Sequence, residues 1–254
     1  MKTICFCNQK GGVGKSTSAI TVSAGLKRRG FKVLAIDLDP QLCLTSVFRA
    51  DPESVNIFSV LTGGVKLKDA IQHTDECDVV PASRMLTQAD MTLTRTGKEY
   101  KLREALNSVK DLYDFCVIDT SPALGILSVN ALTASDGVII PATADSFGVE
   151  GISYLMTTIR DVTEYCNPCL KIEGILLTMT DRTSVTKSFT ALSGKIADTI
   201  GTRVFRSLIR RAVAIRESQL SLESLYKYSP SAPVTQDYEN FIDELLGNTP
   251  AQEN

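Results

Sequence analysis

The sequence predicts a doubly wound α/β domain, with a mainly parallel sheet covered by helices on both faces. Short apolar runs rich in valine, isoleucine and leucine alternate with longer segments of helical periodicity, as in successive βαβ units. A glycine-rich stretch, NQKGGVGKST (8–17), separates the first apolar run from the first helical segment. The chain has 254 residues, 43% of them hydrophobic, which is enough to bury a full core. We therefore expect residues 1–254 to form a single domain.

Each apolar run has the length of a strand, and the segments between runs are long enough to return the chain across the sheet. We expect strands at TICFC (3–7), KVLAID (32–37), CDVVPA (77–82), DFCVID (114–119), GVIIPA (137–142), IEGILLTM (172–179) and RVFRSLI (203–209). We expect helices at 15–29, 84–95, 99–110, 124–134, 149–165, 184–200, 213–224 and 237–246. Ligands of such sheets bind beyond the carboxyl ends of the strands, so the loops there should carry the site.

Composition limits the class of protein. The net charge is −2, so any contact with nucleic acid needs a local basic patch. The N-terminus lacks the apolar core of a signal peptide, and no run approaches the roughly 18 apolar residues of a membrane span. Seven cysteines, an odd number, fit free thiols in a reducing cytoplasm. We expect a cytoplasmic protein without an N-terminal helix-turn-helix domain, since the glycine-rich stretch begins at residue 8.

Cys166 and Cys169, in CNPC, have the spacing of a metal knuckle or a redox pair. A zinc site would need two more ligands, yet His73 is the chain's only histidine and no second C-x-x-C exists. A redox pair would begin a helix, whereas this pair follows a helical segment. We expect ordinary loop cysteines, and a surface position for His73.

The glycine-rich stretch has the composition of a phosphate-binding loop. Its glycines leave the backbone N–H groups free to wrap an anion, and the helix that follows adds the positive end of its dipole. Lys15 would reach the β- and γ-phosphates, and the Ser16 hydroxyl would bind Mg²⁺. We assign nucleotide binding to Lys10, Gly11, Gly12, Val13, Gly14, Lys15, Ser16 and Thr17.

Lys10 is a second lysine within this loop, and Gln9 stands where the usual pattern has a glycine. A lysine before the tight turn should project away from the phosphates that its own backbone encloses. If a second copy of the chain packs on top, Lys10 would neutralise the γ-phosphate of that copy, as an arginine finger does in trans. The alternative is a solvated lysine.

Three aspartates close expected strands beside this loop. Asp37 and Asp39 lie at the end of the second strand, and Asp119 ends DFCVID. Asp119 has the position of an aspartate that holds Mg²⁺ through water. Any one of them could instead cap a helix, but three together with a phosphate loop favour a metal and phosphate site.

KGGVGKST, with its early lysine, resembles the deviant Walker A motif of the ParA/MinD family of ATPases. LAIDLDPQ (34–41) resembles the second family motif, VIDTSPALGILSVNAL (117–132) the Walker B strand and helix, and GILLTMTDRTS (174–184) a late strand and loop. The resemblance covers nearly the whole chain and is strongest to the small partition ATPases of the ParA/Soj type. It implies a P-loop ATPase with ATP and Mg²⁺ as cofactors and slow turnover that a partner stimulates.

The resemblance also implies roles for single residues. Lys10 would act across an ATP-sandwich homodimer, Asp39 would orient or deprotonate the attacking water, and Asp37 would lie nearer the magnesium shell. The implied catalytic residues are Lys10, Lys15 and Asp39, and the implied metal residues are Ser16, Asp37, Asp39 and Asp119. The residues implied to contact adenine are Met179, Arg210 and Ala212. The last two lie in I-R-R-A-V-A (209–214), where relatives often have I-P-R-N-V-R.

A basic segment suggests a polyanion as partner. From Arg182 to Arg216 there are eight basic residues and one acidic residue, so this segment carries +7 and the remainder −9. Such asymmetry favours sequence-independent phosphate contacts, with solvated helix faces as the alternative. Family members bind DNA nonspecifically through arginines of this region. We predict contacts with double-stranded DNA from Arg182, Lys187, Arg211 and Arg216.

The resemblance thus implies a nucleoid-associated partition ATPase with a ParB-like DNA-binding partner protein. A MinD-like membrane regulator is disfavoured, because the last 19 residues carry five acidic residues and no lysine or arginine. An iron–sulfur carrier is disfavoured because CNPC precedes the sixth expected strand. A nucleotide switch that acts on a protein partner without hydrolysis stays open, although Lys10 and Asp39 favour hydrolysis.

Overall fold

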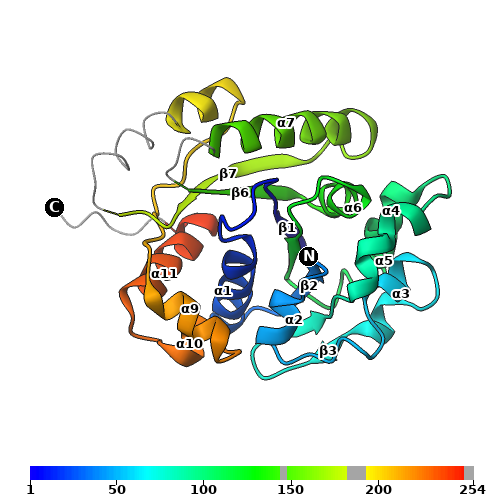
Figure 1. Ribbon diagram of the computed structural model, residues 1–254, viewed down its shortest axis with the longest axis horizontal. Helices are drawn as coiled ribbons and strands as arrows, with labels where there is room; N and C mark the ends of the chain where they lie inside the picture. Colours follow the sequence, from blue (N-terminus) through cyan, green and yellow to red (C-terminus); the bar gives the residue numbers. More distant parts are fainter. Residues whose placement is uncertain (144–147, 182–192, 249–254) are drawn as a thin grey trace.

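A seven-stranded sheet in the order β3-β4-β2-β5-β1-β6-β7 lies at the centre of the fold (Figure 1). The computed structural model describes residues 1–143, 148–181 and 193–248. The strands are β1 Lys2–Phe6, β2 Val33–Leu38, β3 Gln72–His73, β4 Asp78–Val80, β5 Phe115–Thr120, β6 Gly137–Thr143 and β7 Lys171–Thr178. All neighbouring strands pair in parallel except β3, which pairs antiparallel with β4 at the edge.

The helices connect these strands and cover both faces of the sheet. They are α1 Lys15–Arg28, α2 Cys43–Val47, α3 Ile57–Leu61, η1 Leu67–Ala70, η2 Arg84–Gln88, α4 Ala89–Thr92, η3 Lys98–Tyr100, α5 Lys101–Asn107, α6 Ile126–Ala134, α7 Gly148–Tyr165, α9 Val213–Leu220, α10 Leu225–Tyr228 and α11 Pro233–Leu245. Residues 193–199 are also helical. Within the described ranges, no helix is long and apolar enough to cross a membrane.

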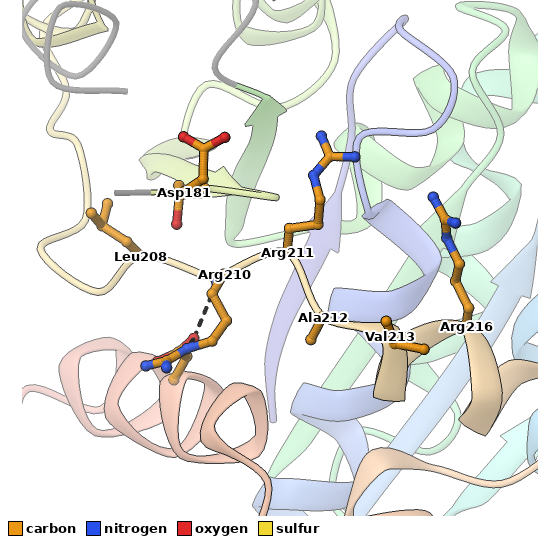
Figure 2. Close-up of a pocket in the computed structure, with 9 residues that line it drawn as sticks. Asp181, Leu208, Arg210, Arg211, Ala212, Val213 and Arg216 are labelled. Carbon is orange, nitrogen blue, oxygen red and sulfur yellow. Dashed lines mark hydrogen bonds and ion pairs between the residues drawn. The ribbon is translucent and has the colours of Figure 1, made fainter. Parts of the chain in front are cut away.

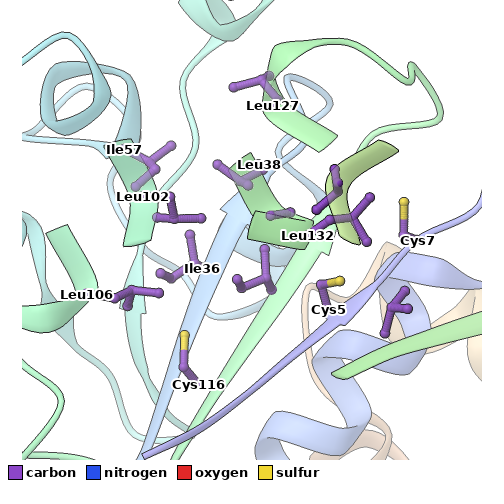
Figure 3. Close-up of a cluster of buried hydrophobic side chains, with 14 of the residues drawn as sticks. Cys5, Cys7, Ile36, Leu38, Ile57, Leu102, Leu106, Cys116, Leu127 and Leu132 are labelled. Atoms are coloured by element: carbon purple, nitrogen blue, oxygen red, sulfur yellow. The ribbon is translucent and has the colours of Figure 1, made fainter. Parts of the chain in front are cut away.

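Two buried cores follow from the alternation of side chains along each strand. In β1, Cys5 faces the core under α3, α5, α6 and α7, whereas Ile4 and Phe6 face the core under α1, α2, α10 and α11. Figure 3 shows the first of these cores, where Ile36 and Leu38 of β2 lie near Leu102 of α5. Because both faces are buried, the strands are apolar almost throughout.

The register of the central strands brings the carboxyl ends of β1, β2 and β5 together. Asp119 of β5 is the register partner of Asp37 of β2 and of Phe6 of β1. The loop after β1 therefore begins beside both aspartates, although β1 and β2 are 26 residues apart in the chain. This edge of the sheet carries the candidate site, as expected for a doubly wound sheet.

Six of the seven expected strands are present, each within two residues of its expected bounds. The expected strand at 203–209 was wrong. The backbone of this segment pairs with β7 only through isolated hydrogen bonds, for example from Phe205 N to Ile175 O. The backbone N–H groups of Arg206 and Ser207 instead donate to the Glu244 carboxylate of α11, each at 2.9 Å. A side chain thus takes the donors that a continuous ladder would need.

Several expected helices also have different bounds. The helix expected at 84–95 is a 3₁₀ turn followed by α4, which ends at Thr92. The helix expected at 213–224 ends at Leu220, and Leu222 adopts a left-handed backbone conformation. The last helix starts at Pro233 and not at residue 237, with proline in its first turn, where a missing N–H does no harm. Of the helix expected at 184–200, residues 184–192 lie outside the described residues.

Candidate nucleotide site

The loop between β1 and α1 is held in place by hydrogen bonds to the ends of neighbouring strands. Asn8, fully buried, donates through Nδ2 to the carbonyl of Pro141 at 2.7 Å and accepts through Oδ1 from Lys10 N at 3.1 Å. Thr178, at the end of β7, donates through Oγ1 to the Val13 carbonyl at 2.8 Å. The loop is thereby tied to the carboxyl ends of β6 and β7 as well as to β1.

Two glycines allow the loop to turn. Gly12 has φ 73° and Gly14 has φ 83°, both in the left-handed region that side chains with a Cβ atom disfavour. Gly14 directly precedes α1, and no side chain caps this helix end. The first N–H groups of α1 are therefore available to an anion, which the helix dipole also favours.

Lys15, the first residue of α1, is a buried lysine. Its side chain donates from Nζ to the Lys10 carbonyl at 3.0 Å, folded back over the loop. Burial lowers the pKa of Lys15, while the negative charges of Asp119 and Asp39 oppose this shift. A buried cation that points along a phosphate loop is suited to a polyanionic ligand.

Asp37 is fully buried, and both of its carboxylate oxygens already accept hydrogen bonds. Oδ1 accepts from Asp39 N at 3.0 Å, and Oδ2 accepts from the N and Oγ1 atoms of Thr45, at 2.8 and 2.7 Å. Thr45 Oγ1 in turn accepts from Ala82 N at 2.9 Å. Burial raises the pKa of Asp37 to about 6, although these hydrogen bonds oppose the shift. Asp37 therefore links the end of β2 to Thr45 of α2 and, through Thr45, to Ala82 in the segment after β4.

Asp119 has a different environment. It is completely buried, and neither carboxylate oxygen accepts a hydrogen bond from the described residues. Burial, followed by the negative charge of Asp37, raises the pKa of Asp119 well above its usual value, and the Ser16 hydroxyl partly offsets this rise. An unpartnered buried carboxylate is unfavourable unless a cation or donor completes its surroundings.

The surroundings of Asp119 fit a magnesium ion. Carboxylate and hydroxyl oxygens, here from Asp119 and Ser16, are the hard ligands that Mg²⁺ prefers. Within the described ranges, no group of three or more histidine, cysteine, aspartate or glutamate side chains is placed to hold a metal ion. The ion would therefore depend on phosphate oxygens and water for its remaining ligands, as is usual for Mg²⁺ at phosphate sites.

A cavity of about 390 Å³ opens above the phosphate loop, within the size range of ligand pockets. One wall consists of Gly12, Gly14, Lys15, Ser16, Thr17, Asp39, Gln41, Cys43 and Pro122, and the other of Met179, Arg211, Ala212, Ile215, Arg216 and Gln219. Asp39 is nearly buried at this cavity and accepts from Gln41 N through Oδ1 at 2.9 Å. The cavity is thus lined by the phosphate loop, by Asp39 and by α9.

A second cavity, of about 680 Å³, shares Arg211, Ala212 and Arg216 with the first and therefore adjoins it. Figure 2 shows that Arg210 points to α11, where its Nε and Nη2 atoms donate to the two oxygens of Asp237, at 2.7 and 2.8 Å. Arg211 and Arg216 point to the opposite side. Of the predicted adenine residues, Met179 and Ala212 line the first cavity and Arg210 lines the second.

The structure also locates the residues predicted to contact DNA, and the cysteines. Arg211 and Arg216, predicted for DNA, line the cavity that contains the phosphate loop, and Arg182 and Lys187 lie outside the described residues. Ile215 and Gln219 of α9, which line this cavity with Arg216, were not predicted from the sequence. The available signal was the helical spacing of Gln219, three residues after Arg216 and four after Ile215. All seven cysteines are free, Cys169 is exposed, and His73 is a surface residue.

Fold and site together define a P-loop nucleoside triphosphatase. A model of the AAA domain family matches residues 1–172. The sporulation initiation inhibitor protein Soj of Bacillus subtilis is 35% identical in an alignment of 253 positions that covers 97% of this chain and 99% of Soj. The chromosome partitioning protein ParA of Caulobacter vibrioides is 33% identical, over 97% of this chain and 94% of its own.

A solved structure with the same fold is that of cobyrinic acid a,c-diamide synthase from Mycobacterium smegmatis with bound ATP analog and magnesium. It is 32% identical, with a TM-score of 0.84, and the match covers 97% of this chain and 94% of that chain. From the family match and the two relatives, the chain belongs to the AAA domain family and, within it, to the partition ATPases of the ParA/Soj type.

Replacing Asp119 by asparagine is expected to change how stability depends on pH. Because folding raises the pKa of Asp119, the folded chain binds the carboxyl proton of Asp119 more tightly than the unfolded chain does. The free energy of unfolding therefore falls as the pH rises above 3.8, the usual pKa of an aspartate. Asp119→Asn has no charge to bury. Urea unfolding of nucleotide-free protein from about pH 5 to about pH 8 should show the wild type losing stability relative to the variant.

Asp111→Asn, which changes an exposed aspartate, is the control and should follow the wild type. Addition of Mg²⁺ with ADP should stabilise the wild type and leave Asp119→Asn nearly unchanged. Parallel pH profiles for wild type and Asp119→Asn would contradict the assignment of an unpartnered buried charge.

Proposed function

We propose that this chain is a DNA-partition ATPase that dimerises on ATP, binds double-stranded DNA without sequence preference, and leaves the DNA on hydrolysis. Residues 1–254 act as one ATPase domain in this proposal. The observation that carries it is the unpartnered, buried Asp119 beside a phosphate loop whose lysine is folded over the site. The partition role of the ParA/Soj-type ATPases supports the assignment of chromosome or plasmid segregation.

ATP and Mg²⁺ are the cofactors of this site. Lys15 and the N–H groups of the glycine loop bind the β- and γ-phosphates, and Ser16 with Asp119 holds the metal. Mg²⁺ held there would offset the negative charge that develops on the phosphate oxygens. The ATP analog and magnesium bound in the 32% identical structure support this choice of cofactors.

Asp39 is the residue that orients or deprotonates the attacking water, since it is at the cavity and its Oδ2 atom has no hydrogen bond to a described residue. Asp37 was predicted as a metal ligand. Its oxygens accept three hydrogen bonds, so we assign Asp37 to positioning, because it fixes the backbone of Asp39. Lys10 completes the site of a second copy and neutralises its γ-phosphate in trans.

DNA binding rests on the charge of the 182–216 segment, with Arg182, Lys187, Arg211 and Arg216 as the contributing residues. A homodimer presents the segment twice and so doubles the phosphate contacts. A ParB-like partner protein that stimulates hydrolysis would then release the ATPase locally. The protein is accordingly placed in the cytoplasm, on the nucleoid.

Sedimentation velocity of Asp39→Ala tests the dimer. This variant keeps Lys10, Lys15 and Asp119, so it should bind ATP with Mg²⁺ without turning it over. We expect a dimer with ATP and Mg²⁺, and a monomer with ADP or without nucleotide. A monomer in all three conditions would contradict the proposed function.

A further inference from the structure

Helix α9 forms the wall of the nucleotide cavity that faces the phosphate loop. Ile215, Arg216 and Gln219 line this cavity, and Gln219 lies one helical turn after each of the other two. The sequence reasoning assigned only Arg216 a role there, as a DNA contact. The position of α9 suggests a role toward the nucleotide.

One hydrogen bond fixes α9 to the phosphate end of the cavity. Gln219 donates from Nε2 to Thr17 Oγ1 at 2.9 Å, across 202 residues of sequence. Thr17 lies in the first turn of α1, next to Lys15 and Ser16. A nucleotide in the cavity would therefore lie between the loop and the face of α9 that Gln219 holds in place.

Arg216 is one helical turn before Gln219 and lines both cavities. Arg210 forms an ion pair with Asp237, whereas Arg211 and Arg216 form no ion pair within the described part of the chain. Their side chains extend to the same side of the segment, opposite to Arg210 (Figure 2). Arg216 is thus an exposed guanidinium at the rim of a phosphate site, without a carboxylate partner among the described residues.

The charges at the bottom of the cavity leave room for this cation. The positive charge of Lys15 is partly offset there by the nearby carboxyl groups of Asp119 and Asp39. A guanidinium can bind two phosphate oxygens at once, which a lysine cannot do.

We propose that α9 is a nucleotide-sensing helix, in which Arg216 binds the polyphosphate of the nucleotide in its own chain and Gln219 positions Thr17 beside it. The proposal rests on the proposed function and deepens it. In the nucleotide-bound chain Arg216 serves the nucleotide, and Arg182, Lys187 and Arg211 remain for DNA. Occupancy of the site by nucleotide then changes what the basic segment offers to DNA.

Isothermal titration calorimetry of the full chain with Mg²⁺ and ATP, ADP or AMP, without DNA, tests this inference. Arg216→Ala should bind ATP and ADP about tenfold more weakly or worse, the usual loss when a hydrogen bond to a charged group is removed. The loss for AMP should be smaller, and Arg216→Lys should recover part of the ATP affinity. Gln219→Ala should also weaken ATP binding, while its unfolding midpoint without nucleotide stays that of the wild type.

Arg206→Ala is the matched control, since Arg206 is an exposed arginine of the same segment that lines neither cavity. It should bind all three nucleotides as the wild type does. Wild-type affinity of Arg216→Ala for ATP and ADP, or an equal loss in Arg206→Ala, would overturn the inference and leave the proposed function standing. A wild-type chain that binds no ATP would contradict the proposed function, and this inference with it.

Discussion

Lys10→Ala is expected to lower ATP turnover about 10³-fold or more, the range found when a charge supplied in trans is removed from phosphoryl transfer. Lys15, Ser16 and Asp119 remain in place, so each chain still binds ATP with Mg²⁺. The loss should appear in the rate of phosphate release and not in nucleotide affinity. A steady-state phosphate assay, together with calorimetric titration of ATP, separates these two effects.

Two further variants make the result specific. Gln9→Ala changes the exposed neighbour of Lys10 and should keep turnover near that of the wild type. Lys15→Ala should lose ATP binding itself, since its ammonium group is folded over the phosphate loop. If Lys10→Ala turned over ATP at the wild-type rate, the role in trans would be wrong.

Affinity for random-sequence duplex DNA should rise on the order of 10²-fold or more when ATP replaces ADP, because a dimer binds with two linked surfaces. The logarithm of affinity falls with the logarithm of salt concentration in proportion to the phosphates neutralised, so the ATP form should also show the steeper salt dependence. Arg182→Ala combined with Lys187→Ala should weaken binding and lower the slope by about one unit for each DNA phosphate that is no longer neutralised.

Lys110→Ala, an exposed lysine outside the basic segment, is the control and should leave the slope unchanged. Fluorescence anisotropy at several salt concentrations measures all of these quantities. Equal affinity with ATP and ADP would argue against DNA release on hydrolysis. It would favour a nucleotide switch that acts on a protein partner.

The sequence sufficed for the sheet and the phosphate loop because both depend on local patterns. Strands buried on both faces are continuous apolar runs, and the glycines, Lys15 and Ser16 follow a spacing that the phosphate imposes. The register that joins Asp37 with Asp119 then follows from parallel pairing of β2 and β5. Short elements such as α3 and α10 were missed, since four or five residues carry too little periodicity.

The remaining features depend on contacts between distant segments. Glu244 of α11 takes the N–H groups of Arg206 and Ser207, which no local pattern in the apolar run 203–209 indicates. Thr45 similarly occupies the oxygens of Asp37, so an aspartate in a metal motif has a structural set of partners. The face of α9 that lines the nucleotide cavity could likewise not be predicted, because it depends on the hydrogen bond between Gln219 and Thr17, 202 residues apart.

Mixing Lys10→Ala with Asp39→Ala tests most directly whether each site is completed by a second chain. Alone, each variant forms dimers in which both sites lack one essential group. In a mixed dimer, the site of the Lys10→Ala chain has its own Asp39 and receives Lys10 from the partner. Random pairing makes half of the dimers mixed, each with one complete site of two, so an equal mixture should recover about a quarter of wild-type turnover. A mixture no more active than the sum of its two components would contradict the composite site.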